Sequence, residues 1–292
     1  WVRDALLGRD TADIDIAVGS DALEVASNVA DAFGGKSVIL DIENRIARVV
    51  LPRTDNKDAT LPGLPRQLDF STFEGTIEQD LARRDFTINT MAVSLNRLSP
   101  QARIIDPFDG RGDLGRGIIR VVTETALAAD AVRLLRAVRL SAELGFSIDT
   151  QTESLIRRHS HLISGVAGER VREELLRLLA VSGAAQLRYL DELELLITLI
   201  PEMAETKGVE QPKEHFWDVF EHSLRTVAAV DYLLRRGSWE YAGEEVLVAV
   251  PWSSVLADHF AREVSSGSTR RSLLKLASLL HDVNKPQTKA LD

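Results

Sequence analysis

The chain has 292 residues, 45% of them hydrophobic and 27% charged, which predicts two or more domains with ordinary cores. Its net charge of −9 argues against attachment to nucleic acid through overall charge, so such binding would depend on local basic patches. No apolar run reaches the roughly 18 residues of a membrane-spanning helix, and the lack of cysteine excludes disulfides and thiolate metal sites. The first residues do not form a secretory signal, and we expect a cytoplasmic protein with no membrane partner.

Residues 1–122 alternate β-rich and helical segments, which predicts an α/β head domain. Polar and apolar side chains alternate over 13–18, as in a half-buried strand. We expect Ser20 to cap a helix over 21–33, which Gly34 ends. The later predictions in this domain are strands at 45–51 and 67–73 around a loop at 52–65, a helix opened by a capping box of Thr76 and Gln79, and strand-like segments at 91–95 and 103–105.

From residue 126 apolar residues recur at spacings of three and four, which predicts helices. The predicted helices are 126–145, 150–163, 168–180 and 183–200, then, after a break at 201–212, 214–236, 253–265 and 270–281. We therefore predict a head domain at 1–122, a helical neck and body for nucleotide selection and RNA binding at 123–205, and a further helical domain at 206–292.

Two acidic residues on the first predicted strand are candidates for metal binding. Asp13 and Asp15 are two residues apart, so their side chains should share one face with Cα atoms roughly 6.6 Å apart. Carboxylates in this arrangement can share a pair of Mg²⁺ ions, which prefer oxygen ligands. Asp69, on the predicted strand 67–73, is a candidate third carboxylate. The alternative is an ordinary solvated strand face, where such pairs are common.

Five segments carry clustered charges in a fixed order along the chain. They are VRDALLGRDTADIDIA at 2–17, RRDFTIN at 83–89, DPFDGRGDL at 106–114, DAVRLLRAVR at 130–139 and GERVREEL at 168–175. In sequence and in order they resemble the five motifs of class II tRNA nucleotidyltransferases and bacterial poly(A) polymerases.

The resemblance implies an α+β fold, with a polymerase-β-like nucleotidyltransferase head built on a mixed or antiparallel sheet and then an all-α neck and body. It implies Mg²⁺-dependent transfer of a nucleotide from CTP or ATP to the tRNA 3′ end, with Asp13 and Asp15 as catalytic carboxylates; Asp69 is added to them as the candidate third carboxylate from its place on the predicted strand. The nucleotide-binding residues that it implies are Arg3, Arg84, Asp85, Asn89, Asp130, Arg133, Arg136 and Arg139.

Some of these residues also have a direct chemical interpretation. Asp85 and Asn89 stand four apart, on one face if the segment is helical, where they could bond ribose hydroxyls, and Arg84 adds charge for a triphosphate. The resemblance gives Asp85 the discrimination between ribose and deoxyribose. Asp106 and Gly110 fit a structural turn that packs the head against the neck.

Asp130 and Arg133 stand three apart on a predicted helix. An acceptor-only carboxylate beside a planar guanidinium can imitate a base-pairing edge, and the resemblance implies that this pair selects C and A without a template. The alternative is a simple helical salt bridge. Arg136 and Arg139 could reach triphosphate or the tRNA backbone. Arg170 and Arg172 could contact RNA phosphates or bridge the neighbouring glutamates at 169, 173 and 174.

One position departs from the resemblance. Similar enzymes often carry Glu immediately before the aspartate of the fourth motif, where this chain has Ala129. Enzymes that add CCA, only CC, only A or poly(A) share most of these motifs, so the product stays open. Similar enzymes also place Gly-Gly just before the position of Trp1, and we expect the sequence to be a fragment.

A second metal site is implied near the end of the chain. His281 and Asp282 follow an apolar segment and, with His222 upstream, resemble the HD motif of metal-dependent phosphohydrolases, which implies a partial HD domain at 206–292. Imidazoles beside a carboxylate suit a transition metal such as Mn²⁺ or Ni²⁺. The alternatives are a chance dipeptide and a scaffold that binds RNA. The other histidines, His159, His161, His215 and His259, are expected to be surface or packing residues.

The preferred function is therefore tRNA CCA-end addition or repair. A poly(A) polymerase is the nearest alternative, because it keeps the chemistry and changes the product. An HD-type phosphohydrolase with a vestigial head belongs to another class, and it needs an intact HD ligand set. A non-catalytic RNA-binding protein is disfavoured because both the Asp13–Asp15 pair and the segment 83–89 are present.

Overall fold

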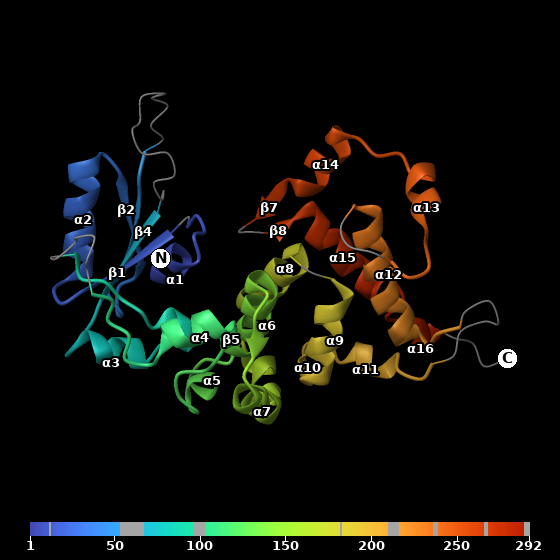
Figure 1. Cartoon of the computed structure of the whole chain (residues 1–292), viewed down its shortest axis with the longest axis horizontal. Coiled ribbons are helices and arrows are strands. Elements are labelled where there is room, and N and C mark those ends of the chain that lie inside the picture. Colours follow the sequence, from blue (N-terminus) through green and yellow to red (C-terminus); the bar gives the residue numbers. More distant parts are fainter. Residues whose placement is uncertain are drawn as a thin grey trace. The chain divides into compact units, whose positions relative to one another are not determined.

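The structure is a computed structural model in which the chain forms two compact units, Trp1–Arg116 and Gly117–Asp292 (Figure 1). The described residues are 1–11, 13–52, 67–95, 103–181, 183–209, 216–235, 239–265 and 268–288, without the side chains of Asp13 and Glu244. Within these residues, no helix combines the length and the apolar character needed to cross a membrane.

The first unit contains one sheet and several short helices. Its elements are α1 (Val2–Leu6), β1 (Asp13–Val18), α2 (Ala22–Phe33), β2 (Lys36–Asp41), β3 (Ile46–Val50), β4 (Gln67–Thr72), α3 (Ile77–Ala82), the 3₁₀ turn η1 (Thr87–Asn89) and α4 (Gly110–Arg116). The strand order is β1-β4-β3-β2, with β1 parallel to β4 and the other neighbours antiparallel. This mixed sheet agrees with the predicted head.

Helix α2 covers one face of the sheet. It presents alanines at 22, 26 and 30, four residues apart, to the buried Ala47, Val49 and Phe70 of the strands. The small alanine side chains let the helix approach the strands closely. Because side chains alternate along a strand, the residues beside these buried ones face the opposite side of the sheet, where the candidate active site lies.

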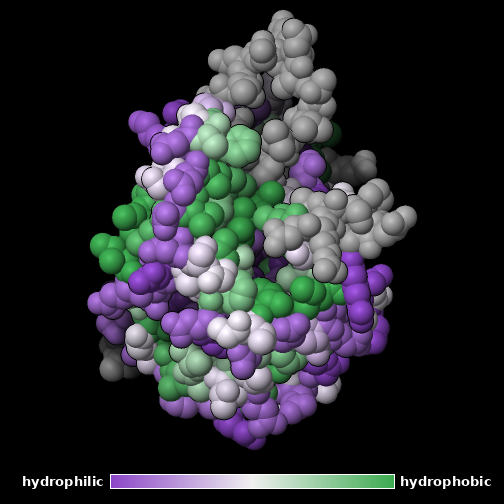
Figure 2. All heavy atoms as spheres, turned by 90° about the vertical axis from the view of Figure 1, so that its left-hand side faces the viewer, coloured by the Kyte–Doolittle hydropathy of each residue, from purple (hydrophilic) through white to green (hydrophobic). Residues whose placement is uncertain are grey.

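Strand β2 was not predicted from the sequence, because its residues, KSVILD, do not alternate between polar and apolar. In the structure its side chains are almost all exposed. It is an edge strand of the sheet. Val38, Ile39 and Leu40 are each about half exposed, and Phe33 at the end of α2 is 66% exposed. Figure 2 shows apolar side chains gathered among polar ones on the side of the molecule that carries α2 and β2.

The local signals in the first unit were mostly interpreted correctly. Gly34 ends α2 with a left-handed φ of 65°, and Thr76 and Gln79 form the predicted capping box of α3. The predicted cap at Ser20 was wrong, since the side chain of Asp21 accepts the hydrogen bond from Leu23 N. The strand-like segments at 91–95 and 103–105 contribute a single bridge, Ala92 to Ile105, within their described residues. The predicted loop 52–65 lies outside the described residues from position 53 onward.

The second unit is almost entirely helical. Its helices are α5 (Ala126–Ala129), α6 (Val132–Leu144), α7 (Thr150–His159), the 3₁₀ segment η3 (Ser160–Gly165), α8 (Gly168–Val181), α9 (Ala184–Glu192), α10 (Leu195–Leu199), α11 (Glu202–Glu205), α12 (Val219–Leu233), α13 (Glu244–Ala249), α14 (Ser254–Ala261), α15 (Arg270–Leu280) and α16 (Lys285–Thr288). Two pairs of very short strands accompany them: β5 (Ile118–Ile119) with β6 (Ser147–Ile148), and β7 (Glu263–Ser265) with β8 (Ser268–Thr269).

Two helix pairs organise this unit. Helix α6 packs on α8, and α12 packs on α15. A nearly fully buried Lys275 of α15 forms an ion pair with Asp231 of α12, so the second pair is joined by charge as well as by apolar contact. The predicted helix 126–145 is interrupted at Asp130, which has an extended backbone and separates α5 from α6.

The predicted α+β class is confirmed, since a head with a mixed sheet precedes a helical body. The boundary between the two units falls between Arg116 and Gly117, a few residues before the predicted boundary at 122. The division into three domains stays a prediction.

Candidate active site

The carboxylates Asp15 and Asp69 face the same side of the sheet. They are paired residues of the neighbouring parallel strands β1 and β4, and paired residues project to one face. Phe70, next to Asp69, is buried against α2, and Ile16, next to Asp15, packs on the same core. Both carboxylates therefore lie on the face opposite α2. Asp13 begins β1 in register with Gln67, and its side chain lies outside the described residues.

An arginine completes this row of charges. Arg48 of β3 is in register with Asp69 and donates two hydrogen bonds of 2.7 Å, from Nε and Nη2, to the two carboxylate oxygens. The row therefore runs Asp15, Asp69, Arg48 across three neighbouring strands, and we call it the carboxylate row. Arg48 was not among the predicted site residues. Its signal in the sequence is a charge between Ala47 and Val49, which are both fully buried.

The carboxylate row fits a hard divalent cation. Asp15 is exposed and Asp69 is partly exposed, so solvent ions can reach both. Neighbouring strands lie about 4.8 Å apart, so one cation can contact a carboxylate from each. Carboxylate oxygens are the ligands that Mg²⁺ prefers.

Three predicted nucleotide-binding residues form one hydrogen-bonded chain in the first unit. Arg3 Nη1 donates to Asn89 Oδ1 over 2.8 Å, and Asn89 Nδ2 donates to Asp85 Oδ1 over 3.0 Å. Asp85 is 7% exposed, and the same oxygen accepts a hydrogen bond from the backbone N–H of Phe86. The premise of one α-helical face was wrong, because only Thr87–Asn89 are helical, as a 3₁₀ turn. The two side chains nevertheless meet.

Arg84, the other residue predicted from this motif, lies beside a carboxylate at the end of α3. Its Nη2 is 3.5 Å from Asp80 Oδ2, and about a third of its side chain is exposed. The guanidinium is thus partly exposed, and an anionic ligand can reach it.

The third motif supports the turn that carries Asn89. Asp106 accepts hydrogen bonds from the backbone N–H groups of Gly110 and Arg111, which begin α4. Thr87 Oγ1 donates to the buried Asp113 over 2.7 Å, so α4 is fastened to η1. Gly110 is required there, because a Cβ would lie 2.3 Å from the carbonyl oxygen of Thr87. The structural role is as predicted, but the contact lies inside the first unit.

In the second unit, Asp130 lies between two arginines. Its Oδ2 is 2.8 Å from Arg170 Nη2 and 3.9 Å from Arg133 Nε. Burial alone would raise the pKa of Asp130, but the hydrogen bond and charge of Arg170, with the charge of Arg133, hold it below its usual value. Arg133 also donates to the carbonyl oxygen of Ala126. The structure therefore brings Asp130 and Arg133 together and adds Arg170, which had been expected to contact phosphate or neighbouring glutamates.

The other two arginines of the fourth motif converge on one glutamate. Arg136 Nε donates to Glu174 Oε1 over 2.9 Å, and Arg139 Nε donates to Glu174 Oε2. Arg139 also pairs with Glu143 and is 6% exposed. Burial alone would lower the pKa of Arg139, but Glu174 and Glu143 raise it, so the guanidinium stays charged. Glu174, which joins α8 to α6, was missed as an ion-pair partner of these arginines.

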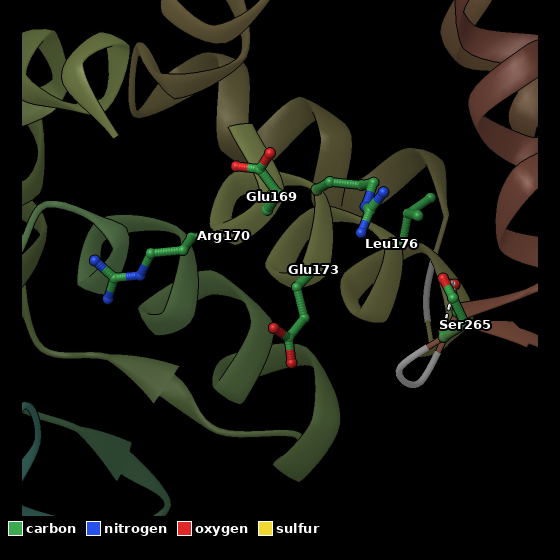
Figure 3. Close-up of a pocket in the computed structure, with 7 residues that line it drawn as sticks. Glu169, Arg170, Glu173, Leu176 and Ser265 are labelled. Carbon is green, nitrogen blue, oxygen red and sulfur yellow. Dashed lines mark hydrogen bonds between the residues drawn. The ribbon is translucent and has the colours of Figure 1, made fainter. Parts of the chain in front are cut away.

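Arg172 lies elsewhere on α8. It lines a small cavity of about 120 Å³ with Glu169, Glu173, Ser265 and neighbouring residues (Figure 3). Figure 3 also shows the Arg170 side chain pointing away from Ser265, in keeping with its ion pair to Asp130. Both arginines of the fifth motif thus line this cavity, and Arg170 in addition pairs with Asp130.

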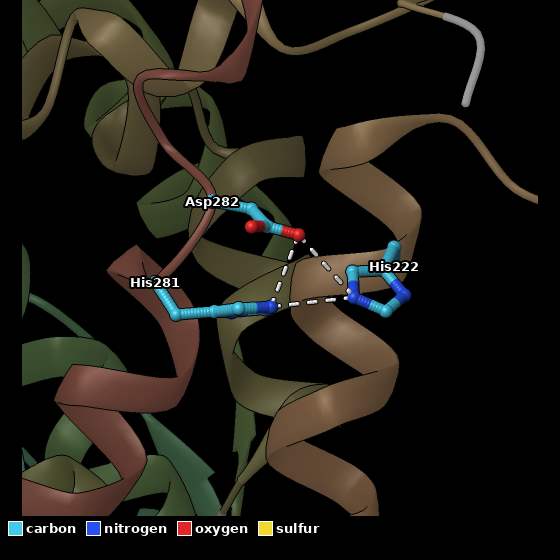
Figure 4. A group of neighbouring side chains, drawn as sticks. All are labelled: His222, His281 and Asp282. Carbon is cyan, nitrogen blue, oxygen red and sulfur yellow. Dashed lines mark hydrogen bonds and ion pairs between the residues drawn. The ribbon is translucent and has the colours of Figure 1, made fainter. Parts of the chain in front are cut away.

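The predicted histidine cluster also comes together in the second unit. His222 of α12 and His281 at the end of α15 bring their Nε2 atoms to 3.3 Å, and Asp282 Oδ2 lies 3.5 Å and 3.1 Å from them (Figure 4). The three ligand atoms lie within 4.8 Å of one another, as a shared metal requires. His281 Nδ1 is 2.8 Å from the carbonyl oxygen of Ser278, which can only accept. This contact suits the neutral tautomer with the proton on Nδ1, in which the Nε2 lone pair is available for a ligand.

The other histidines among the described residues of the second unit take no part in this cluster. His259 is exposed and lies 2.7 Å from Arg270 through Nδ1. His161 is also exposed, and His159 ends α7. His215 lies outside the described residues.

Comparison with known proteins gives two family matches. Residues 1–120 match the poly(A) polymerase head domain, and residues 145–207 match the probable RNA- and SrmB-binding site of polymerase A. The first match contains the first three motifs and the second contains the fifth, whereas the fourth motif, at 130–139, lies between them.

Similar proteins include two curated bacterial enzymes. A CC-adding tRNA nucleotidyltransferase of Geobacter sulfurreducens is 43% identical over 184 residues, covering 63% of this chain and 40% of that protein. An A-adding tRNA nucleotidyltransferase of Deinococcus radiodurans is 35% identical over 297 residues, covering 100% of this chain and 57% of that protein. The chain thus spans about half the length of these relatives.

Solved structures share the fold along nearly the whole chain. The Thermotoga maritima CCA-adding enzyme complexed with tRNA-CCA is 26% identical with a TM-score of 0.62, covering 98% of this chain and 63% of that one. A tRNA nucleotidyltransferase complexed with a primer tRNA and an incoming ATP analogue is 25% identical with a TM-score of 0.60, covering 100% and 82%. Through its head domain and RNA-binding region, the chain belongs to the family of class II tRNA nucleotidyltransferases and bacterial poly(A) polymerases.

Proposed function

We propose that the chain carries a template-independent nucleotidyltransferase activity that adds nucleotides to the tRNA 3′ end, in the reaction NTP + RNA-3′OH → RNA-NMP + PPi. The observation that carries the proposal is the pairing of Asp15 with Asp69 on one face of the sheet. Asp13 lies two residues before Asp15 on the same strand. The relatives named as CC-, A- and CCA-adding enzymes, and the related structures with CTP or ATP, support tRNA, CTP and ATP as substrates.

The carboxylate row would hold the metal. Mg²⁺ bound to Asp13 and Asp15, with Asp69 as a third carboxylate, would supply the positive charge that activates the 3′-hydroxyl and stabilises the departing pyrophosphate. The rigid pairing of β1 with β4 orients these side chains before substrate arrives. Catalysis would then depend on positioning and charge in an in-line displacement.

The sugar and triphosphate would be held by the chain that runs from Arg3 through Asn89 to Asp85. Asp85 presents a carboxylate that can accept a hydrogen bond from the ribose 2′-hydroxyl, which deoxyribose lacks. Arg3 orients the Asn89 amide by donating to its oxygen. Arg84 is the partly exposed cation for the triphosphate.

Base selection would rest on Asp130 and Arg133, which together present an acceptor and a donor fork. Arg170 holds the Asp130 carboxylate ionised and therefore able to accept from a base amino group. Arg136 is partly exposed and is the candidate for phosphate or tRNA backbone contact, whereas the buried Arg139 would act by positioning α6. Arg172, which is exposed, is a candidate contact for RNA phosphate.

Which nucleotides the chain adds to the RNA remains to be measured. Relatives that add CC, A or CCA all match this chain, and Ala129 stands where similar enzymes often have Glu. The test supplies the purified protein with tRNAs lacking one, two or all three terminal nucleotides, and with CTP or ATP separately. A CCA-adding enzyme extends each tRNA with the nucleotide that it lacks next, a CC- or A-adding enzyme extends only some of the tRNAs, and all of them stop at a defined length. A poly(A) polymerase instead adds many adenylates to each RNA, including unrelated ones.

A second candidate activity is favoured by the cluster of His222, His281 and Asp282. These residues would hold Mn²⁺ or Ni²⁺, as in a partial HD-type phosphohydrolase domain at 206–292. The test measures hydrolysis of p-nitrophenyl phosphate with either metal. Activity that survives Asp15→Asn and disappears in His281→Ala supports this activity, and no hydrolysis with either metal refutes it.

A further inference from the structure

The carboxylate row contains its own cation. Asp69 gives both carboxylate oxygens to Arg48, in a bidentate pair with two hydrogen bonds of 2.7 Å. The side chains are 34% and 21% exposed, so the pair is partly screened from water and its geometry is set by the strand register. Asp15 lies on the other side of Asp69, on the neighbouring strand.

We infer that Arg48 is a positioning residue that occupies Asp69 in the nucleotide-free protein and so weakens binding of a divalent ion by the carboxylate row. The inference rests on the proposed metal role of Asp15 and Asp69. A metal that uses Asp69 must share its oxygens with a planar fork that already donates one hydrogen bond to each of them. The guanidinium charge, one strand away from Asp69, also repels an incoming cation.

This arrangement has a consequence for the order of binding. The free protein should hold Mg²⁺ weakly, because one carboxylate is engaged and a fixed positive charge lies next to it. A nucleoside triphosphate brings its own negative charge, which offsets Arg48. Tight metal binding should therefore coincide with nucleotide binding rather than precede it.

The experiment measures binding of Mn²⁺, a paramagnetic substitute for Mg²⁺, by electron paramagnetic resonance in the absence of nucleotide. Every protein carries His281→Ala, so that the histidine cluster does not contribute. Arg48→Met should raise the affinity for Mn²⁺ about tenfold, because a unit charge beside the ion is removed. Arg48→Lys keeps the charge but not the fork, and should give a smaller rise. Arg45→Met is the matched control, since Arg45 pairs with Asp21 at an exposed site, and should leave the affinity unchanged.

The double variant Arg48→Met with Asp69→Asn decides whether the effect passes through Asp69. The inference predicts that the gain disappears in this protein. An unchanged affinity in Arg48→Met, or a gain that survives Asp69→Asn, overturns it. Circular dichroism checks the fold of each protein, and Arg48→Lys gives the decision if Arg48→Met does not fold. Failure of the proposed function has a different signature, because none of the proteins would then transfer nucleotides, and Asp15→Asn would leave Mn²⁺ binding unchanged.

Discussion

Asp130 and Arg170 form a 2.8 Å ion pair, although 40 residues separate them in the sequence. Asp130 lies at the break between α5 and α6, and Arg170 lies in the first turn of α8. The pair ties the fifth motif to the fourth and keeps the Asp130 carboxylate charged. This gives the fifth motif a physical task that its sequence alone did not reveal.

Replacing Arg170 by Met should destabilise the protein modestly at neutral pH. The pKa of Asp130 is held below its usual value in the folded protein, so the pair stabilises the fold above the unfolded pKa of about 3.9. That contribution is lost as the pH falls through the lowered pKa. For a partly exposed pair we expect a loss of about 0.5 kcal/mol near pH 7 and none in strong acid. Urea titrations of Arg170→Met near pH 7 and in acid check this, with Arg172→Met as the control. An equal loss of stability in Arg170→Met at the two pH values would contradict it.

Replacing Glu174 by Ala should destabilise the protein strongly. The change leaves the buried Arg139 without one of its two carboxylates, and removing one partner of a buried pair costs about 3 kcal/mol. The neighbouring Glu173→Ala is the control, because the side chain of Glu173 is 52% exposed. Chemical denaturation of the two variants measures the difference. Equal free energies of unfolding would show that Glu174 does not hold α6 to α8.

Two glycines of α4 offer a matched comparison. Gly110→Ala should cost about 1–3 kcal/mol, because its Cβ would meet the Thr87 carbonyl oxygen at 2.3 Å, and it should displace η1 and Asn89. Gly115→Ala lies in the same helix with open space around its Cβ, and it should stabilise by about 0.5–1 kcal/mol. Thermal melts compare the stabilities, and nucleotide affinity reports on Asn89. Matching effects of the two variants would remove the structural role assigned to the third motif.

We expect His222, His281 and Asp282 to bind a transition metal, and this binding should not depend on the carboxylate row. His281→Ala removes one of three ligand atoms, and we expect at least a tenfold loss of Ni²⁺ affinity by isothermal titration calorimetry. His259→Ala is the control, because His259 is an exposed histidine bonded to Arg270, and it should bind Ni²⁺ normally. If His281→Ala and the unaltered protein bound Ni²⁺ equally, His222, His281 and Asp282 would not form a metal site.

Features with a local cause could be predicted from the sequence. The strand Asp13–Val18 and the capping box at Thr76 depend on neighbours within a few residues, and both are confirmed. The break at Asp130 could not be predicted, because apolar spacing continues across it and only the backbone shows the interruption. Strand β2 was missed because its almost fully exposed residues do not alternate between polar and apolar along the sequence.

Ion pairs between distant elements needed the structure. Arg48 meets Asp69 across 21 positions, and Arg139 meets Glu174 across 35. The first pair depends on strand register and the second on helix packing, which spacing in the sequence does not specify. The resemblance to known motifs predicts Asp13, Asp15 and Asp85 as site residues, but it does not show which contacts hold them in place.

The central claim is that the carboxylates of β1 support nucleotide transfer by holding a divalent metal. The most direct measurement is the incorporation of labelled CTP and ATP into tRNA lacking its terminal nucleotides, by Asp13→Ala and Asp15→Asn variants whose fold is verified by circular dichroism. The account predicts that each variant loses incorporation by at least a thousandfold while tRNA binding persists, since removing metal charge compensation costs roughly 4 kcal/mol or more of the barrier. Full incorporation by either folded variant would contradict the account.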